Sequence, residues 1–195
     1  MSASPRTLLA SLLATTLLLA ACACSRTPEE PNRPATGDTP APTTAPAPAK
    51  KQTSCPADPE GGPPMLPVHT LTVRENNVQF ACELVYKPDD TQRGLMYRTH
   101  LADDRGMLFK LPRRIQRFWM HNTCISLDML FVDEDGTIVG ILEKVPPLND
   151  ESRSIGKPTT YVLELAAGAA SRFGVQAGQH LDLPATIREL AVAED

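Results

Sequence analysis

The sequence lacks the short motifs that mark the common classes of catalytic and cofactor-binding domains. It contains no dinucleotide fingerprint, no glycine-rich phosphate loop and no grouping of serine, histidine and aspartate typical of a hydrolase. Its four histidines and five cysteines show no His-x-x-x-His or Cys-x-x-Cys spacing, so a zinc or redox site has no support. We therefore expect no metal and no cofactor.

Basic segments are also scarce. The chain carries a net charge of −4, and its lysines and arginines are scattered apart from Arg113, Arg114 and Arg117. So small a cluster in an acidic chain attracts a phosphate backbone only weakly. We therefore expect no nucleic-acid partner.

Long apolar runs are absent after residue 21, so no later segment is expected to cross a bilayer core of roughly 30 Å. Residues 8–21 are apolar and follow Arg6, a pattern typical of a secretory signal. The run ends in Leu19-Ala20-Ala21-Cys22, which resembles a bacterial lipobox and implies that Cys22 receives a lipid. We expect a signal peptide over residues 1–21 and a membrane partner reached through the lipid on Cys22.

This anchor places the protein in the bacterial cell envelope, outside the cytoplasm. In a diderm host, Ala23 beside Cys22 favours the periplasmic face of the outer membrane. The alternatives are an ordinary cleaved signal, or cleavage before Cys24. Of the 19 prolines, 12 lie between residues 25 and 67, so we predict a disordered proline-rich linker over residues 22–67 and a single domain over residues 68–195.

Three cysteines remain in or beside the predicted domain. Cys82 alternates with Phe80 and Leu84, which directs its thiol into the core. Outside the cytoplasm two cysteines can form a bridge, and the pairing we favour joins Cys55 to Cys124.

Short segments of alternating polarity, separated by turn residues, predict a mainly β (α+β) fold: an antiparallel barrel- or sandwich-like sheet with two short helices. The predicted helices begin at Pro88 and at Ala167. The predicted strands cover residues 69–73, 78–84, 106–109, 115–121, 129–132, 138–144, 161–165 and 180–183.

Three segments together resemble the domain-of-unknown-function family 192. They are Arg93-Gly94-Leu95-Met96-Tyr97-Arg98, Phe118-Trp119-Met120-His121-Asn122-Thr123-Cys124-Ile125-Ser126-Leu127-Asp128, and Tyr161-Val162-Leu163-Glu164-Leu165. The similarity covers roughly residues 73–183, and it implies a fold more firmly than an activity. His121 stands where the family commonly has a lysine or arginine, which puts in doubt any role that needs a cation there.

The second of these segments contains the candidate binding residues. On a strand, Trp119 and His121 would face one way and Met120 and Asn122 the other, so both faces would carry a polar group. Trp119 and Met120 either line a ligand pocket or belong to the core. Asn122 either contacts a ligand or makes a structural hydrogen bond.

Asp128 precedes an apolar strand and needs a partner if it is buried. Arg93 and Arg98, in the first resembling segment, are the candidate partners, and such a pair would fasten a helix to the sheet. The functional alternative is a charge-lined cleft beside Trp119. We therefore expect Trp119 and Asn122 to border a concave site, with Arg98 and Asp128 paired beneath it.

Two functions remain open at this point. The first, which we favour because no catalytic grouping is recognised, is a non-catalytic envelope module that binds a small molecule, a glycan or a protein partner near Trp119. The second is a hydrolase-type enzyme that uses Asp128 and Glu164, with His121. Two acids about 5 to 10 Å apart in one cleft would support the enzyme.

Overall fold

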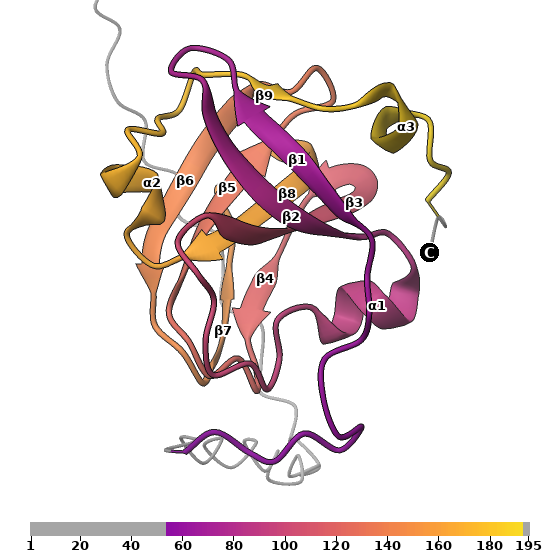
Figure 1. Cartoon of the computed structure of the whole chain (residues 1–195), viewed down its shortest axis with the longest axis vertical. Coiled ribbons are helices and arrows are strands. Elements are labelled where there is room, and N and C mark those ends of the chain that lie inside the picture. Colours follow the sequence, from indigo (N-terminus) through magenta and orange to yellow (C-terminus); the bar gives the residue numbers. More distant parts are fainter. Residues whose placement is uncertain (1–53, 193–195) are drawn as a thin grey trace, which may run out of the picture. The chain divides into compact units, whose positions relative to one another are not determined.

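A seven-stranded mixed sheet curved into a half-barrel forms the centre of the computed structural model, which describes residues 54–192 (Figure 1). Its strands lie in the order β6-β5-β8-β3-β2-β1-β9, and β2 with β3 is the parallel pair. The strands are β1 (Val68–Val73), β2 (Val78–Val85), β3 (Arg105–Ile115), β5 (Leu127–Val132), β6 (Ile138–Val145), β8 (Pro158–Ala166) and β9 (Leu181–Asp182). A separate two-stranded sheet pairs β4 (Phe118–Met120) with β7 (Asn149–Arg153).

The mainly β prediction is confirmed, but the sheet is mixed, and the described residues contain three short helices where two were expected. These are α1 (Pro88–Arg93), α2 (Ala169–Arg172) and α3 (Ala185–Arg188). The α1 helix begins with proline and carries acids in its first turn, as its sequence indicates. The α3 helix was missed because it is a single turn, held from outside by the Lys110 ammonium, which donates to the carbonyls of Ile187, Arg188 and Leu190.

The strand predicted over residues 115–121 is broken in two. β3 slips in register against β8 between Lys110 and Arg114, around Pro112, which cannot donate to the ladder. The Gln116 amide then donates to the carbonyls of Pro112 and Thr159, which holds the chain in a break before β4. Because β4 ends at Met120, the alternation predicted beyond that residue does not hold.

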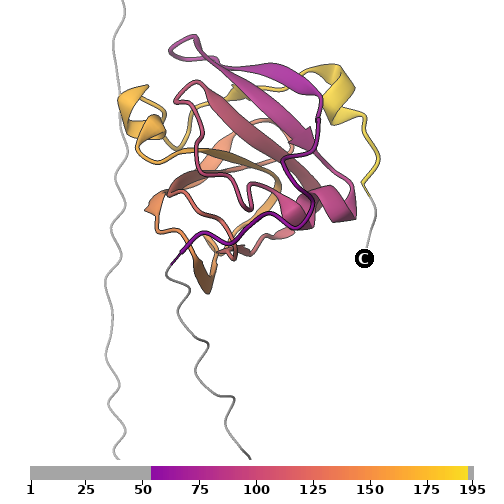
Figure 2. The same ribbon diagram turned by 60° about the horizontal axis from the view of Figure 1, so that its bottom comes forward.

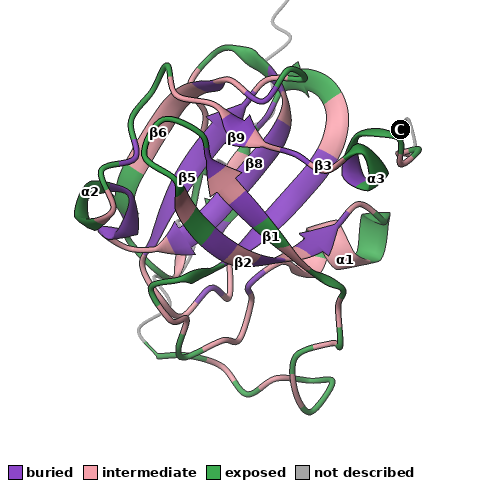
Figure 3. Ribbon diagram, turned by 45° about the horizontal axis from the view of Figure 1, so that its top comes forward, coloured by how far each residue is buried: buried purple, intermediate pink, exposed green. Residues whose placement is uncertain are grey.

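Both faces of the central strands are covered, which Figure 3 shows as buried ribbon at the middle of the sheet. On β8, Leu163 and Leu165 join a core with β1, β2 and α2, while Val162 joins a second core with β4 and the residues after α1. Cys82 is buried in the first core with a free thiol, as its alternation predicts.

Residues 54–67, which precede β1, make contacts with the domain. Within residues 54–67, Cys55 forms a disulfide with Cys124, and Leu66 packs against the second core. The pairing favoured from the sequence is therefore confirmed, and Figure 2 shows this segment running along one side of the domain. We call residues 54–67 the N-terminal strap.

The predicted signal peptide and Cys22 lie outside the described residues. Among residues 54–192 there is no helix with the length and apolar character needed to cross a membrane.

Candidate functional site

Trp119 projects outward from β4. Its neighbours Phe118 and Met120 face the second core, where the Phe118 ring packs edge-to-face on Phe109 and Met120 is fully buried. Trp119 is 50% exposed, although aromatic side chains of its size are usually well buried. Trp119 is therefore not a core residue, whereas Met120 is.

A cavity of about 390 Å³ lies beside Trp119, between α1, the second half of β3 and the segment that leads into β4. Its apolar walls include Leu95, Met96, Phe109 and Phe118. The exposed side chains at its mouth include Trp119, Arg114 and Arg117. We call this cavity the Glu164 pocket, after the acid that lines its buried end.

Glu164 is 4% exposed, and its carboxyl group faces the second core from β8. The residues opposite it in register are Met107 on β3 and Met129 on β5, both fully buried, so its lateral neighbours are apolar. Within residues 54–192 the carboxyl makes no hydrogen bond and no ion pair, and desolvation by burial raises the pKa of Glu164 to about 8. At pH 7 the group is therefore mostly neutral and can both donate and accept a hydrogen bond.

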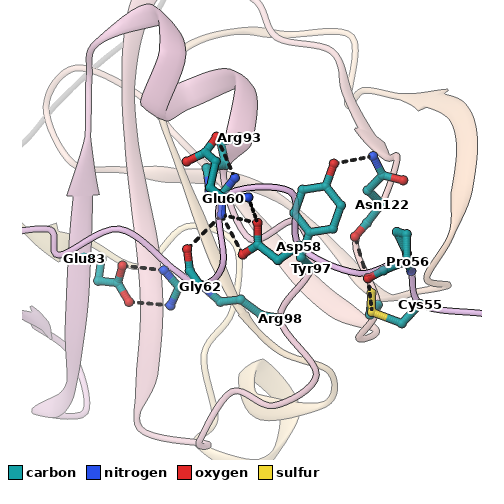
Figure 4. A network of polar contacts seen from close by, with 11 residues as sticks. Cys55, Pro56, Asp58, Glu60, Gly62, Glu83, Arg93, Tyr97, Arg98 and Asn122 are labelled. Atoms are coloured by element: carbon teal, nitrogen blue, oxygen red, sulfur yellow. Dashed lines mark hydrogen bonds and ion pairs between the residues drawn. A yellow bond between two sulfur atoms is a disulfide. The ribbon is translucent and has the colours of Figure 1, made fainter.

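The predicted ion pair between Asp128 and Arg93 or Arg98 does not form. Arg93 lines the pocket but binds the N-terminal strap, with its Nη2 2.7 Å from an Asp58 oxygen and its Nη1 2.9 Å from Glu60. Arg98 makes a bidentate pair with Glu83 on β2 (Figure 4). Arg93 therefore holds the N-terminal strap against the domain, and Arg98 holds the segment after α1 against β2.

Asp128 is fully buried and accepts backbone hydrogen bonds instead. Its carboxylate oxygens receive the N–H groups of Lys144, Gly168 and Ala170 at 2.8 to 3.0 Å. These three N–H groups satisfy the hydrogen-bonding capacity of the buried carboxylate, so no cation is needed. This is the physical reason that the ion-pair prediction was wrong.

Asp128 and Glu164 lie on opposite faces of the sheet. In the antiparallel pairing of β5 with β8, Asp128 stands opposite Leu165 and Met129 opposite Glu164, and residues that are directly opposite share a face. The sheet itself therefore separates the two acids, so the two-carboxylate site of the hydrolase hypothesis is not assembled.

His121 and Asn122 lie beyond the end of β4. His121 Nδ1 is 2.8 Å from Asp150, and its ring centroid is 5.1 Å from that of Trp119. Asn122 has a φ of 52°, and its side-chain amide donates a hydrogen bond to the Tyr97 hydroxyl (Figure 4). Of the two roles considered for Asn122, a ligand contact and a structural hydrogen bond, the structure supports the second. Of the candidate residues, Trp119 and Arg93 line the pocket, while Met120, His121, Asn122, Asp128 and Arg98 do not.

From the sequence, Glu164 was expected only as the second acid of a catalytic pair. A stronger signal was present, because Tyr161-Val162-Leu163-Glu164-Leu165 places one acid in an otherwise apolar strand. Such strands are buried on both faces, so the acid had to be buried as well. Among the described residues, no three His, Cys, Asp or Glu side chains gather as they would around a metal ion.

Comparisons with known proteins connect this geometry to a family. Residues 70–183 match the model of the family DUF192, described as Uncharacterized ACR, COG1430. A comparison with curated proteins found no match.

Two crystal structures are similar to this chain. A protein of unknown function from Novosphingobium aromaticivorans DSM 12444 is 31% identical, with a TM-score of 0.59, over 68% of this chain and 95% of that one. A protein from Sinorhizobium meliloti 1021, described as a candidate transcription regulator, is 39% identical, with a TM-score of 0.55, over 58% of this chain and 89% of that one. The chain therefore belongs to the uncharacterised family DUF192, through the domain that contains the Glu164 pocket.

Proposed function

We propose that this protein is a lipid-anchored envelope protein whose domain binds a small molecule, without catalysis, in the Glu164 pocket. One observation carries the binding site: Glu164, a residue that is only 4% exposed, lies at the buried end of the cavity, and within the described residues its carboxyl group has no hydrogen-bond or ion-pair partner. Buried polar groups without partners are rare in folded proteins because each costs about 1 to 3 kcal/mol, so their presence calls for an explanation. A ligand that completes the hydrogen bonds of Glu164 is such an explanation.

The dimensions and lining of the cavity support the same conclusion. Small-molecule sites are clefts of about 300 to 1,000 Å³ with mostly apolar walls and a few polar groups that orient the ligand. The Glu164 pocket has a volume of about 390 Å³, and its lining combines the four apolar residues named above with polar and cationic residues and with one acid at its buried end. Trp119 at the mouth offers a flat apolar surface to the exposed part of a ligand.

A glycan or a protein partner remains an alternative for the surface around Trp119 and Ile115, which are both exposed. We do not extend the transcription-regulator description of the Sinorhizobium protein to this chain. The net charge is −4, and Arg113 of the small basic cluster is paired with Asp133 at 3.2 Å. Little positive charge is therefore left for a phosphate backbone.

Trp119 and Ile115 provide a matched test of the pocket. Both are large apolar side chains, 50% and 46% exposed, but only Trp119 lines the cavity. A collection of small polar and amphipathic molecules is screened against the purified protein by thermal shift, and each hit is measured again with the two alanine variants. We expect Trp119→Ala to weaken binding at least tenfold and Ile115→Ala to leave it unchanged, with surface-type stability losses of about 0.5 kcal/mol in both.

Two results would contradict the pocket as a ligand site. One is a hit that binds both variants equally well. The other is a Trp119→Ala variant that loses about 3 to 5 kcal/mol of stability, as a core tryptophan would.

The lipid anchor is tested separately through Cys22. Replacing Cys22 by Ser should stop the incorporation of labelled fatty acid and move the protein from the membrane fraction to the soluble fraction. Retention of label and membrane partition by this variant would remove the anchoring part of the proposal.

A further inference from the structure

The charges that line the Glu164 pocket are unequally distributed between its buried end and its mouth. Arg93 is neutralised by Asp58 and Glu60, both in the N-terminal strap. The Lys110 ammonium donates to the backbone carbonyls of Ile187 and Arg188 in α3 and of Leu190 beyond it. Beside these two cations, the lining brings Glu164 at the buried end and the exposed Arg117 at the mouth.

Arg117 is the guanidinium best placed to meet a ligand. It is exposed, and within the described part of the chain it makes no ion pair. Glu164, in contrast, is only 4% exposed and lines the buried end of the same pocket. The pocket therefore has an acidic buried end and a basic mouth that are separated by apolar walls.

We propose that the ligand is a zwitterion with an apolar body, namely an amino acid or short peptide that enters with its amine first. This inference rests on the proposed function of the pocket. The ammonium group of the ligand donates to Glu164, its apolar side chain lies against Leu95 and Phe109, and its carboxylate meets Arg117. Each part of the ligand then faces a group of opposite character.

Molecules with one charge fit this arrangement less well. A simple amine would satisfy Glu164 but would be repelled by Arg117 at the mouth. A simple carboxylate would be attracted to the mouth but would leave the buried acid without a donor. A neutral apolar molecule would fill the cavity and leave both polar ends without a partner.

Binding of such a ligand is linked to proton release. At pH 7 both the ligand amine and Glu164 are mostly protonated, since the pKa of Glu164 is raised to about 8. Formation of an ammonium–carboxylate pair requires the carboxyl to lose its proton to the solvent. The affinity should therefore fall by up to about tenfold per pH unit as the pH decreases from 8 to 6. The other charged or titratable groups that line the pocket are Tyr86, Arg93, Lys110, Arg114 and Arg117.

Three matched probes separate the two ends of the ligand. The dipeptide Leu-Gly carries both charges, N-acetyl-Leu-Gly lacks the amine, and Leu-Gly amide lacks the carboxylate. Binding to the purified full chain is measured by calorimetry in two buffers of different ionisation enthalpy, and by the fluorescence of Trp119, the only tryptophan. We expect Leu-Gly to bind most tightly, with the release of close to one proton at pH 7.

Two variants assign the contacts. Glu164→Gln should weaken Leu-Gly at least tenfold, abolish the proton release and leave the weak binding of N-acetyl-Leu-Gly unchanged. Arg117→Gln, at an exposed position where folding is not at risk, should weaken Leu-Gly several-fold. It should not weaken Leu-Gly amide, which has no carboxylate to lose its partner and is relieved of repulsion at the mouth.

The zwitterion inference is overturned if the three probes bind equally, if none binds, or if Glu164→Gln binds Leu-Gly as the parent protein does. Those outcomes leave the pocket itself standing, because its own test compares Trp119→Ala with Ile115→Ala for any small molecule. Failure of that comparison would remove both proposals.

Discussion

Glu164 shows how a single residue can be poorly suited to stability and well suited to binding. Its strand neighbours in register are methionines, and its carboxyl has no partner within the described residues. An apolar residue of similar size would pack there without any desolvation cost. Side chains that break the local rule for a buried position are the ones to examine for function.

The first prediction concerns the pH dependence of stability. The folded-state pKa of Glu164 is raised from 4.5 to about 8, so between these values the native state holds a proton that the unfolded state has lost. The contribution of Glu164 to the free energy of unfolding is fully present below pH 4.5. It is lost as the pH rises toward 8, by about 1 kcal/mol per pH unit. We expect Glu164→Gln to remove this decline in denaturant unfolding measured from pH 5 to 9.

Glu143→Gln is the matched control for this prediction, because Glu143 is an exposed acid on β6. This variant should keep the parent pH profile. An identical profile in the parent protein and in Glu164→Gln would show that the Glu164 carboxyl is not buried in neutral form.

At the scale of elements, Asp128 joins three parts of the fold. From β5 it accepts the N–H of Lys144 on β6 and the N–H groups of Gly168 and Ala170 at the start of α2. The short α2 helix has no side-chain cap of its own, so this remote carboxylate supplies the acceptors that its first turn lacks. Asp128 therefore determines where the chain turns after β8.

The second prediction follows from the geometry of these bonds. One Asp128 oxygen accepts from Lys144 and Gly168, and the other accepts from Ala170. In Asp128→Asn the amide oxygen can replace only one of them, and the amide nitrogen would then face a backbone N–H. We expect a loss of about 1 to 3 kcal/mol in the free energy of unfolding, with faster hydrogen exchange at Ala170.

Asp104→Asn, at an exposed acid before β3, makes the same chemical change without buried bonds and should alter stability by less than about 0.5 kcal/mol. Equal effects of the two substitutions would argue against the role of Asp128 as a remote cap.

At the scale of the whole molecule, the N-terminal strap connects the start of the domain to the pocket. The Cys55–Cys124 disulfide fixes one end of the strap beyond β4, and Asp58 with Glu60 binds Arg93 at the end of α1 (Figure 4). Arg93 in turn lines the Glu164 pocket. The strap is therefore fastened to the domain by a disulfide and by ion pairs.

The third prediction concerns this cross-link. The disulfide joins residues 69 apart, and closing a loop of this length restricts the unfolded chain by about 4 kcal/mol in the loop-entropy model. We expect a Cys55→Ser, Cys124→Ser double variant to lose up to that amount of stability in denaturant unfolding.

Reductant should have the same effect on the parent protein and none on the double variant, which is the control. Peptide mapping without reductant should recover Cys55 linked to Cys124. Recovery of a bridge to Cys82 would contradict both the pairing and the buried thiol.

Local patterns in the sequence determined much of the fold. Alternation predicted the β1–β2 hairpin and the burial of Cys82, and the proline with two acids predicted the start of α1. With Cys82 directed into the core, few pairings were left for the remaining cysteines, and the favoured one was confirmed. The hairpin, the burial of Cys82 and the start of α1 depend on residues close together in the chain, so period and composition are sufficient to show them.

Partner choice over long sequence distances was decided only by the tertiary structure. The sequence suggested acids for Arg93 and Arg98, but sheet register and the path of the strap gave them Asp58 and Glu83 in place of Asp128. Likewise, alternation within β5 and within β8 cannot tell whether Asp128 and Glu164 share a face. That depends on the register between the two strands, because a slip of one residue moves every side chain of a strand to the other face.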